Sequence, residues 1–248
     1  MRLSAELIEG FSKAIKEYMD DYINLCQAIF EHTFRILGDD SDPYREIKDK
    51  SMKAAETLAP LAEEYITHGD FLERAVKVAI VANALDFGTR VYKISLEKFC
   101  SEFQGMLNRS LAINHVSMLK ADLENAKRVL YVLDNAGECD LDRFLLQALS
   151  NKREVTIATR GGPVLNGVTL KEAVEAGLDR YGELITTGAA LPCISRSSDT
   201  YFLEKLRNAD IAILKGKVII NLSILLMRYA VNPHTISLYL SVCPLPGS

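Results

Sequence analysis

A carboxylate, a carboxamide and a second carboxylate lie within five residues near the middle of the chain. The stretch Asp134-Asn135-Ala136-Gly137-Glu138 follows the apolar run "RVLYVL" and precedes a segment with helical spacing. The side-chain oxygens of Asp134 and Asn135 are hard ligands that suit magnesium or manganese. A helix that begins at Gly137 would also offer free backbone N–H groups to an anion such as phosphate. A metal ion beside a phosphate suits phosphoryl chemistry, whereas the alternative interpretation is a polar turn in which Asp134 caps the helix.

The stretch "TRGGPVLNGVT", residues 159–169, has the composition of a ligand-binding loop. Its glycines let a ligand or another loop come close. Arg160 can bind an oxyanion through two parallel N–H groups, and Asn166 could reach a neighbouring metal or phosphate. The alternative is an ordinary loop between a strand and a helix.

Two further positions carry polar side chains beside apolar runs. Lys215 follows "ADIAIL", and a lysine at the carboxyl end of a strand is a natural phosphate partner; the alternative is a surface lysine at a turn. In "VANALDFG", Asn83 and Asp86 are three residues apart and share one helix face. Among apolar neighbours these two side chains need partners, which predicts that they point into a cleft; the alternative is a helix end capped by Gly88.

Several common catalytic motifs are missing from the sequence. There is no Gly-x-Ser-x-Gly elbow, no Walker A loop and no Gly-x-Gly-x-x-Gly fingerprint. The four histidines show no metal-ligand spacing; they are His32, His68, His115 and His234. The polar stretches above are therefore the candidates for chemistry.

The second half of the chain, from Lys127 onward, alternates short apolar runs with helical patterns. The runs are "RVLYVLD", "EVTIATR", "GELITTG" and "ADIAILKG", and the helical segments are 138–150, 169–178 and 198–208. The residues from Thr169 to Glu172 form a capping box. This alternation predicts a Rossmann-like parallel sheet with right-handed crossovers and helices on both faces. Such sheets bind ligands at the carboxyl ends of their strands, which is where the polar residues fall.

Residues 1–126 show helical spacing throughout and no strand pattern, which predicts a helical bundle subdomain before an α/β subdomain at 127–248. On the first helix the apolar face is formed by Leu3, Leu7, Ile8, Phe11, Ile15, Tyr18 and Tyr22. After "GDDSDP", Asp42 is suited to cap the next helix and Pro43 to its first position. Further helices are expected at about 44–66, 70–87, 95–107 and 114–126.

Composition excludes some classes of protein. The 248 residues include 29 basic and 33 acidic ones, a formal net charge of -4, which argues against nucleic-acid binding. No uncharged apolar run reaches the ~18 residues of a membrane span. The cysteines are scattered and form no C-x-x-C pair, which indicates free thiols in a reducing, cytoplasmic compartment; they are Cys26, Cys100, Cys139, Cys193 and Cys243.

Taken together, "VANALDFG", "LDNAGECDLDR", "TRGGPVLNGVTLKEA" and "RNADIAILKG" resemble the motifs of the damage-control phosphatase family, formerly domain of unknown function 89. The chain resembles its small archaeal-type members up to about Gly216. The resemblance implies a helical subdomain packed on a Rossmann-like one. It also implies a metal-dependent phosphatase of small phosphorylated metabolites, often damaged or side-product sugar phosphates, served by magnesium, manganese, cobalt or nickel.

The resemblance also implies roles for individual residues. Asp134 and Asn135 match two metal ligands, and Lys215 matches a phosphate-binding lysine. Glu138 would orient the helix start or a catalytic water. Asn83 and Asp86 match a helical motif that reaches the site, with Asp86 among the catalytic residues.

Two departures from the family pattern weaken this expectation. Asn166 matches the first residue of an Asn-Asp pair whose aspartate is the third metal ligand, but Gly167 follows it here. Metal affinity should therefore be lower, and a non-catalytic protein that binds phosphorylated metabolites is the alternative function.

The second departure is the tail. Residues 217–248 contain no Asp or Glu, and the family's Gln-Gly-Asn after Lys215-Gly216 is missing. One hypothesis is a one-base frameshift near Lys217, which the other reading frame of the gene would test by encoding Gly-Asn and an acid-bearing continuation. The alternative is a divergent tail with a helix at 218–230 and a strand at 234–242.

Overall fold

The structure is a computed structural model that describes residues 2–38, 42–85, 96–111, 113–188, 190–191, 194, 198–216 and 236–240. The described part of the first 126 residues is helical, as the spacing predicts. Its elements are α1 (Arg2–Tyr18), α2 (Tyr22–Leu37), α3 (Arg45–Thr67), α4 (Phe71–Ala82), the 3-10 turn η1 (Asn83–Leu85), α5 (Leu96–Asn108) and α6 (Val116–Asn125).

The start of α3 differs from the sequence-based expectation. The helix begins at Arg45, and its N-cap residue Tyr44 makes no side-chain capping bond. Asp42 and Pro43 lie before it; Asp42 Oδ1 accepts a hydrogen bond from the Tyr44 backbone N–H at 3.0 Å, and Asp42 Oδ2 pairs with Lys48 at 2.9 Å. The prediction that Asp42 is the N-cap of this helix was therefore wrong: the N-cap position is Tyr44, and the Asp42 carboxylate binds the Tyr44 backbone N–H and Lys48 from the turn before the helix.

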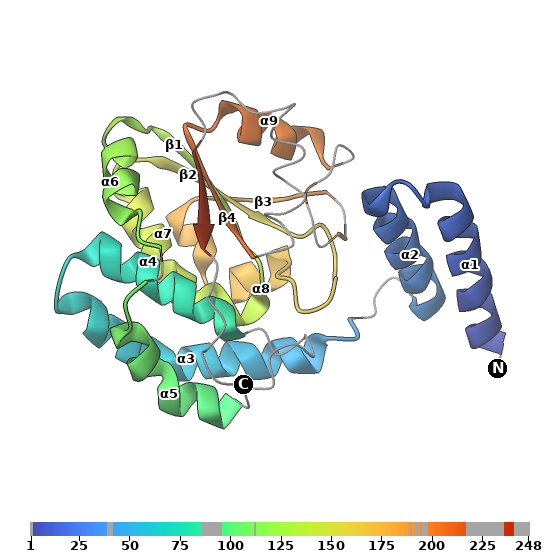
Figure 1. Ribbon diagram of the computed structural model, residues 1–248, viewed down its shortest axis with the longest axis horizontal. Helices are drawn as coiled ribbons and strands as arrows, with labels where there is room; N and C mark the ends of the chain where they lie inside the picture. Colours follow the sequence, from blue (N-terminus) through green and yellow to red (C-terminus); the bar gives the residue numbers. More distant parts are fainter. Residues whose placement is uncertain are drawn as a thin grey trace.

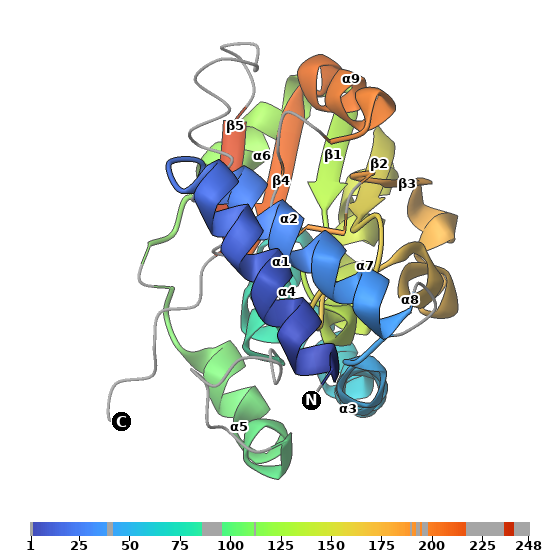
Figure 2. The ribbon, with the colours of Figure 1, turned by 90° about the vertical axis from the view of Figure 1, so that its right-hand side faces the viewer.

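The second half of the chain forms a parallel sheet, which confirms the predicted α/β class. Its strands are β1 (Arg128–Val132), β2 (Glu154–Thr159), β3 (Glu183–Thr186), β4 (Ile211–Lys215) and β5 (Ile236–Leu240), in the order β3-β2-β1-β4-β5. Figure 2 shows β5, β4, β1, β2 and β3 in this sequence across the sheet. The crossovers contain η2 (Ala136–Glu138), α7 (Cys139–Ser150), α8 (Leu170–Glu175), η3 (Leu178–Tyr181) and α9 (Thr200–Asn208).

Both faces of the sheet are covered by helices (Figure 1). Alternate residues of a strand point to opposite faces, so Val129 and Tyr131 of β1 join a large core that also contains residues of α3, α4, α5 and α7. Leu130 and Val132 join a smaller core with Phe202 of α9. Because the large core draws on both halves of the chain, a domain division at residue 126 remains a prediction.

The helices α1 and α2 pack on each other as a hairpin beside the rest of the molecule (Figures 1 and 2). Asp21 caps α2 by accepting a hydrogen bond from the Asn24 backbone N–H. Part of the predicted apolar face remains exposed, with Ile8 at 67% of its full accessible area. None of the helices within the described residues has the length and hydropathy needed to cross a bilayer.

The tail contains one described element. The strand β5 lies inside the range 234–242 that a divergent tail predicts, and it pairs in parallel with β4 from Ile211↔Ile236 to Lys215↔Leu240. The helix predicted at 218–230 falls outside the described residues. The frameshift hypothesis stays open to the gene-sequence test.

Candidate active site

The strand order places the candidate residues at one edge of the sheet. The chain runs from β1 outward to β2 and β3, then crosses back to β4 on the other side of β1. A ligand site is expected at such a switch point, outside the carboxyl ends of the two strands that flank it. Asp134 and Asn135 follow β1, and Lys215 ends β4. The topology therefore brings these three residues to one edge of the sheet.

The two sequence motifs that follow β1 and β2, residues 134–138 and 159–169, lie side by side. The Val168 backbone N–H donates to the Asp134 carbonyl at 3.0 Å, and the Ala136 N–H donates to the Asn166 carbonyl at 3.0 Å. Between these bonds, Asn135 and Gly167 form an antiparallel bridge. The backbone at Gly167, the position that matches the family's third metal ligand, therefore lies beside Asn135, although glycine offers no carboxylate there.

The Asp134 side chain is 21% exposed, whereas Glu138, the other acid of the same motif, is fully buried. Its Oδ1 accepts a hydrogen bond from Arg160 Nη2 at 2.9 Å, and the Arg160 side chain is 3% exposed. On its other side lies Gly216, whose φ of +86° favours glycine and whose Cβ, if present, would overlap the Asp134 carboxylate. Arg160 and Gly216 together fix the position of this carboxylate.

The amide of Asn135 is oriented by Glu138. Asn135 Nδ2 donates to Glu138 Oε1 at 2.6 Å, and Asn83 Nδ2 donates to the same oxygen at 3.0 Å. Glu138 is fully buried, and Asn135 is 5% exposed. The Asn135 nitrogen also donates to Asp134 Oδ2 at 3.3 Å. Because both bonds use the Asn135 nitrogen, its oxygen Oδ1 points away from Glu138. Asn83 thus contacts Glu138, while its predicted contact with substrate stays a prediction.

Lys215 lies behind these residues. Its side chain is fully buried, and Nζ forms ion pairs with Glu138 Oε2 and, at 2.6 Å, with Asp142 Oδ1. Burial lowers the pKa of Lys215, but the charges of Asp142 and Glu138 outweigh this effect and raise it overall. Burial also raises the pKa of Asp142 to about 7, against the opposing charge of Lys215. We call Glu138, Asp142 and Lys215 the Lys215 cluster.

Asp142 was not singled out from the sequence. The available signal was its spacing, because Glu138 and Asp142 are four residues apart and neighbours on a helix face. A direct contact between Lys215 and phosphate remains a prediction, since Nζ is occupied by two carboxylates in this structure.

Gly137 has a packing role that its motif did not indicate. A Cβ at this position would lie 2.5 Å from Cβ of Ser51, which belongs to α3. Glycine therefore lets α3 pack directly against η2. The predicted contact between the Gly137 backbone and phosphate stays a prediction. Asp86 lies outside the described residues.

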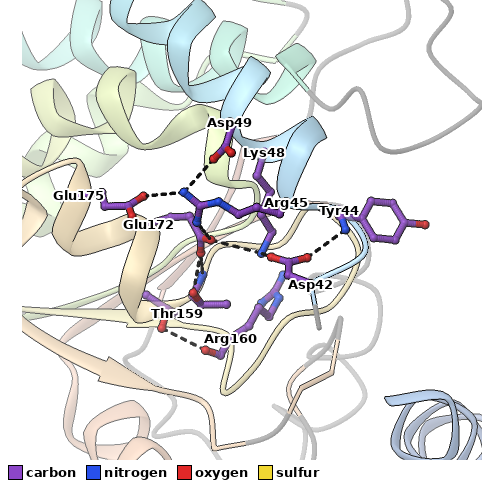
Figure 3. Close-up of polar contacts among 10 residues, drawn as sticks. Asp42, Tyr44, Arg45, Lys48, Asp49, Thr159, Arg160, Glu172 and Glu175 are labelled. Atoms are coloured by element: carbon purple, nitrogen blue, oxygen red, sulfur yellow. Dashed lines mark hydrogen bonds and ion pairs between the residues drawn. The ribbon is translucent and has the colours of Figure 1, made fainter. Parts of the chain in front are cut away.

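A second buried lysine lies where α3 meets α8. Lys48 Nζ pairs with Asp42 Oδ2 at 2.9 Å and with Glu172 Oε1 at 3.5 Å, and Arg45 Nη1 also reaches Glu172 Oε1 at 3.2 Å. Figure 3 shows these side chains converging from the two elements, with Arg160 nearby. Glu172 accepts hydrogen bonds from the backbone and hydroxyl of Thr169, which completes the predicted capping box. We call Asp42, Lys48 and Glu172 the Lys48 cluster.

The donor set fits a weakly held divalent cation. Asp134 offers a carboxylate and Asn135 an amide oxygen whose orientation is fixed. Within the described residues no group of three or more His, Cys, Asp or Glu side chains is placed to hold a metal. Magnesium often binds through one or two carboxylates and completes its shell with water and substrate phosphate, and this mode needs no third protein carboxylate.

Comparisons with known proteins agree with the motifs. The family model described as "Damage-control phosphatase ARMT1-like domain" matches residues 4–239. A damage-control phosphatase of Pyrococcus horikoshii is 33% identical over 211 residues, which are 82% of this chain and 70% of the relative. A damage-control phosphatase of Archaeoglobus fulgidus is 32% identical over 197 residues, 78% of this chain and 67% of the relative. The crystal structure of a DUF89 family protein from P. horikoshii superposes with a TM-score of 0.80 at 26% identity, covering 99% of this chain and 85% of that one.

Proposed function

Because the chain belongs to the family of damage-control phosphatase ARMT1-like domains, we propose that it is a metal-dependent phosphatase of small phosphorylated metabolites. The family and the names of the relatives support the phosphatase class. The metal dependence and the substrate class, phosphomonoesters such as damaged or side-product sugar phosphates, are our proposal. Magnesium, manganese, cobalt or nickel are the metals that we expect to serve.

The observation that carries this proposal is the pairing of Asp134 with an oriented Asn135 at the switch point of the sheet. Asp134 is held by Arg160 at 2.9 Å, and the Asn135 nitrogen is held by Glu138 at 2.6 Å. We propose the hard oxygens of these two neighbouring residues as the metal ligands, because they lie at the sheet edge where α/β proteins bind ligands. A polar turn capped by Asp134 would require neither the buried arginine nor the buried glutamate.

The remaining residues suggest how a phosphomonoester would be held. A bound divalent cation would supply the Lewis acidity that polarises the phosphoryl group. Arg160, whose guanidinium already lies at the site, would neutralise part of the phosphate charge through its paired N–H groups. Asn166 lies in the turn directly before Gly167, which bridges to Asn135, and would contribute polar contacts at the same edge.

A second candidate function is a phosphometabolite-binding protein without turnover. The observation that favours it is Gly167, whose backbone bridges Asn135 but which brings no carboxylate. Fewer anionic ligands lower the affinity for a divalent cation. In this case Arg160 would still bind phosphate.

Phosphate release tests the proposal. p-Nitrophenyl phosphate and a panel of sugar phosphates would be incubated with wild type and Asp134→Ala, with manganese or nickel and with EDTA. We expect turnover that EDTA abolishes and that Asp134→Ala lowers by about 100-fold or more, since it removes the only charged metal ligand proposed.

The matched control is Asp210→Ala, because Asp210 pairs with Arg128 at the opposite, amino-terminal edge of the sheet. Its turnover should stay near that of wild type. A wild type that binds phosphate but releases none would favour the second candidate, and turnover indifferent to Asp134→Ala would contradict the site.

A further inference from the structure

We propose that Asp142, Lys215 and Glu138 are positioning residues that act in series to fix the orientation of the Asn135 amide. In this arrangement the amide presents its oxygen, rather than its nitrogen, to the ligand. The inference rests on the proposed function and extends it to Asp142, a residue outside the motifs that pointed to the site. It also gives Lys215 a role other than contact with phosphate.

The first step is the contact between Glu138 and the two amides. A carboxylate accepts hydrogen bonds and donates none, so any amide that bonds to Glu138 must present its nitrogen. Asn135 does so at 2.6 Å and Asn83 at 3.0 and 3.2 Å. Asp134 Oδ2 accepts from the same Asn135 nitrogen at 3.3 Å, so Glu138 makes the shorter of the two bonds that orient the amide. Without the Glu138 bond the amide could rotate by half a turn more easily, which would put a donor where a cation needs an acceptor.

The second step is the charge that holds Glu138. A fully buried carboxylate requires a compensating positive charge and further hydrogen bonds. Lys215 supplies the charge through its ion pair with Glu138 Oε2, and the two asparagines supply the hydrogen bonds. Lys215 comes from the end of β4 and Glu138 from the turn before α7, so this pair also fixes the distance between the two strand ends.

The third step is the anchor of Lys215. A lysine side chain is flexible, and a single partner leaves its ammonium several arrangements. Asp142 lies in the first turn of α7 and is fully buried, and its Oδ1 is 2.6 Å from Lys215 Nζ. The ammonium is therefore held between two carboxylates of one helical segment. Asp142 thus acts on Asn135 through Lys215 and Glu138, without touching the ligand itself.

Binding of Mn²⁺ alone tests this series without any need for turnover. Isothermal titration would compare wild type with Asp142→Asn and Lys215→Met, each first shown to be folded by circular dichroism. We expect both variants to bind Mn²⁺ about 10- to 100-fold more weakly, the usual effect of removing an outer-shell partner. Lys215→Arg, which keeps the charge, should recover part of the affinity and keeps the test usable if Lys215→Met does not fold.

The matched control is Asp140→Asn. Asp140 lies in the same helical turn and is 8% exposed, but its charge interacts with Arg143 and Glu56 rather than with Lys215. Its Mn²⁺ affinity should match that of wild type. An equal loss in Asp140→Asn would show a general effect of charge and would overturn the inference.

The remaining outcomes separate this inference from the proposed function. If wild type binds Mn²⁺ and the Asp142 and Lys215 variants bind it equally well, the positioning role is wrong while the metal site stands. If those variants keep Mn²⁺ but lose inorganic phosphate, Lys215 is a phosphate contact instead. If wild type binds no Mn²⁺, the metal-dependent function fails and the inference fails with it.

Discussion

Lys48 and Lys215 are both fully buried, and each ammonium lies against two carboxylates. The Lys48 cluster joins α3 to α8, whereas the Lys215 cluster joins the end of β4 to the start of α7. The two differ in what their carboxylates contact next. Glu172 accepts bonds from Thr169 and completes a helix cap, while Glu138 accepts bonds from two asparagines at the switch point. A buried ion pair is therefore a poor indicator of function until its next contact is known.

The largest effects are expected when each lysine is removed, because both variants should lose stability but only one should lose Mn²⁺ affinity. Removing one partner of a buried ion pair typically costs about 3–5 kcal/mol of stability. Lys48→Met and Lys215→Met should therefore both lower the free energy of unfolding by this amount. Only Lys215→Met should also weaken Mn²⁺ binding of the folded protein. Urea unfolding and Mn²⁺ titration measure the two quantities, and equal Mn²⁺ affinity in the two variants would remove the distinction.

The second largest effect is expected for Gly216→Ala, which should alter both stability and Mn²⁺ affinity. Gly216→Ala strains a residue with φ of +86° and places Cβ against the Asp134 carboxylate. Gly38→Ala imposes similar strain at φ of +98° but meets no atom within 4 Å. Each should lose about 1–2 kcal/mol of stability, and only Gly216→Ala should lose Mn²⁺ affinity. Thermal unfolding and calorimetry distinguish them; similar affinity in both would show that Asp134 does not need its present position.

Gly167 tests how the site tolerates a new carboxylate. A Cβ here would lie 2.9 Å from the Val164 carbonyl oxygen and 3.1 Å from Arg160 Cγ. Crowding of this kind costs about 1–3 kcal/mol, so Gly167→Asp and Gly167→Ala should both be less stable. Only Gly167→Asp should bind Mn²⁺ more tightly. If the alanine variant gains the same affinity, the added carboxylate is not a ligand.

The two clusters should also respond oppositely to pH. Because the pKa of Asp142 is raised to about 7, the folded state binds a proton more tightly than the unfolded state, and stability falls as pH rises from about 4 to 7. For Glu172, burial raises the pKa, but hydrogen bonds from Thr169 and the charge of Lys48 outweigh it and lower the pKa overall. Its contribution is present above about pH 4.5 and is lost as pH falls.

Urea unfolding in EDTA between pH 3 and 7.5 checks these signs. In wild type, ionisation of Asp142 should lower the free energy of unfolding by at most about 1.4 kcal/mol per pH unit. Asp142→Asn should remove this decrease. Glu172→Gln should remove a smaller slope in the opposite direction. Slopes of the same sign for the two variants would show that one of the two environments is wrongly described.

Local patterns were sufficient to predict the elements and to place the candidate residues at one edge of the sheet. The runs around Leu130 and Ile213 are short, apolar and bounded by polar residues, and alternation with helical segments implies a parallel sheet. Polar residues at strand ends then predict where a ligand binds. These inferences need only the sequence near each element.

Contacts between distant elements could not be predicted in the same way. The burial of Lys215, the approach of Ser51 to Gly137 and the pairing of Asp42 with Lys48 depend on how α3 and α7 pack, and no local period encodes this. The sequence therefore indicated Lys215 as a phosphate partner, whereas the structure encloses it between Glu138 and Asp142.

Mn²⁺ binding measured by electron paramagnetic resonance tests most directly whether Asp134 and Asn135 hold a divalent cation, as we propose. Free Mn²⁺ would be counted as it is titrated into wild type, Asp134→Ala and Lys48→Met. We expect one bound ion per chain in wild type and in Lys48→Met, and none in Asp134→Ala over the same concentrations. Equal binding in Asp134→Ala and wild type, or no binding in wild type, would contradict the claim.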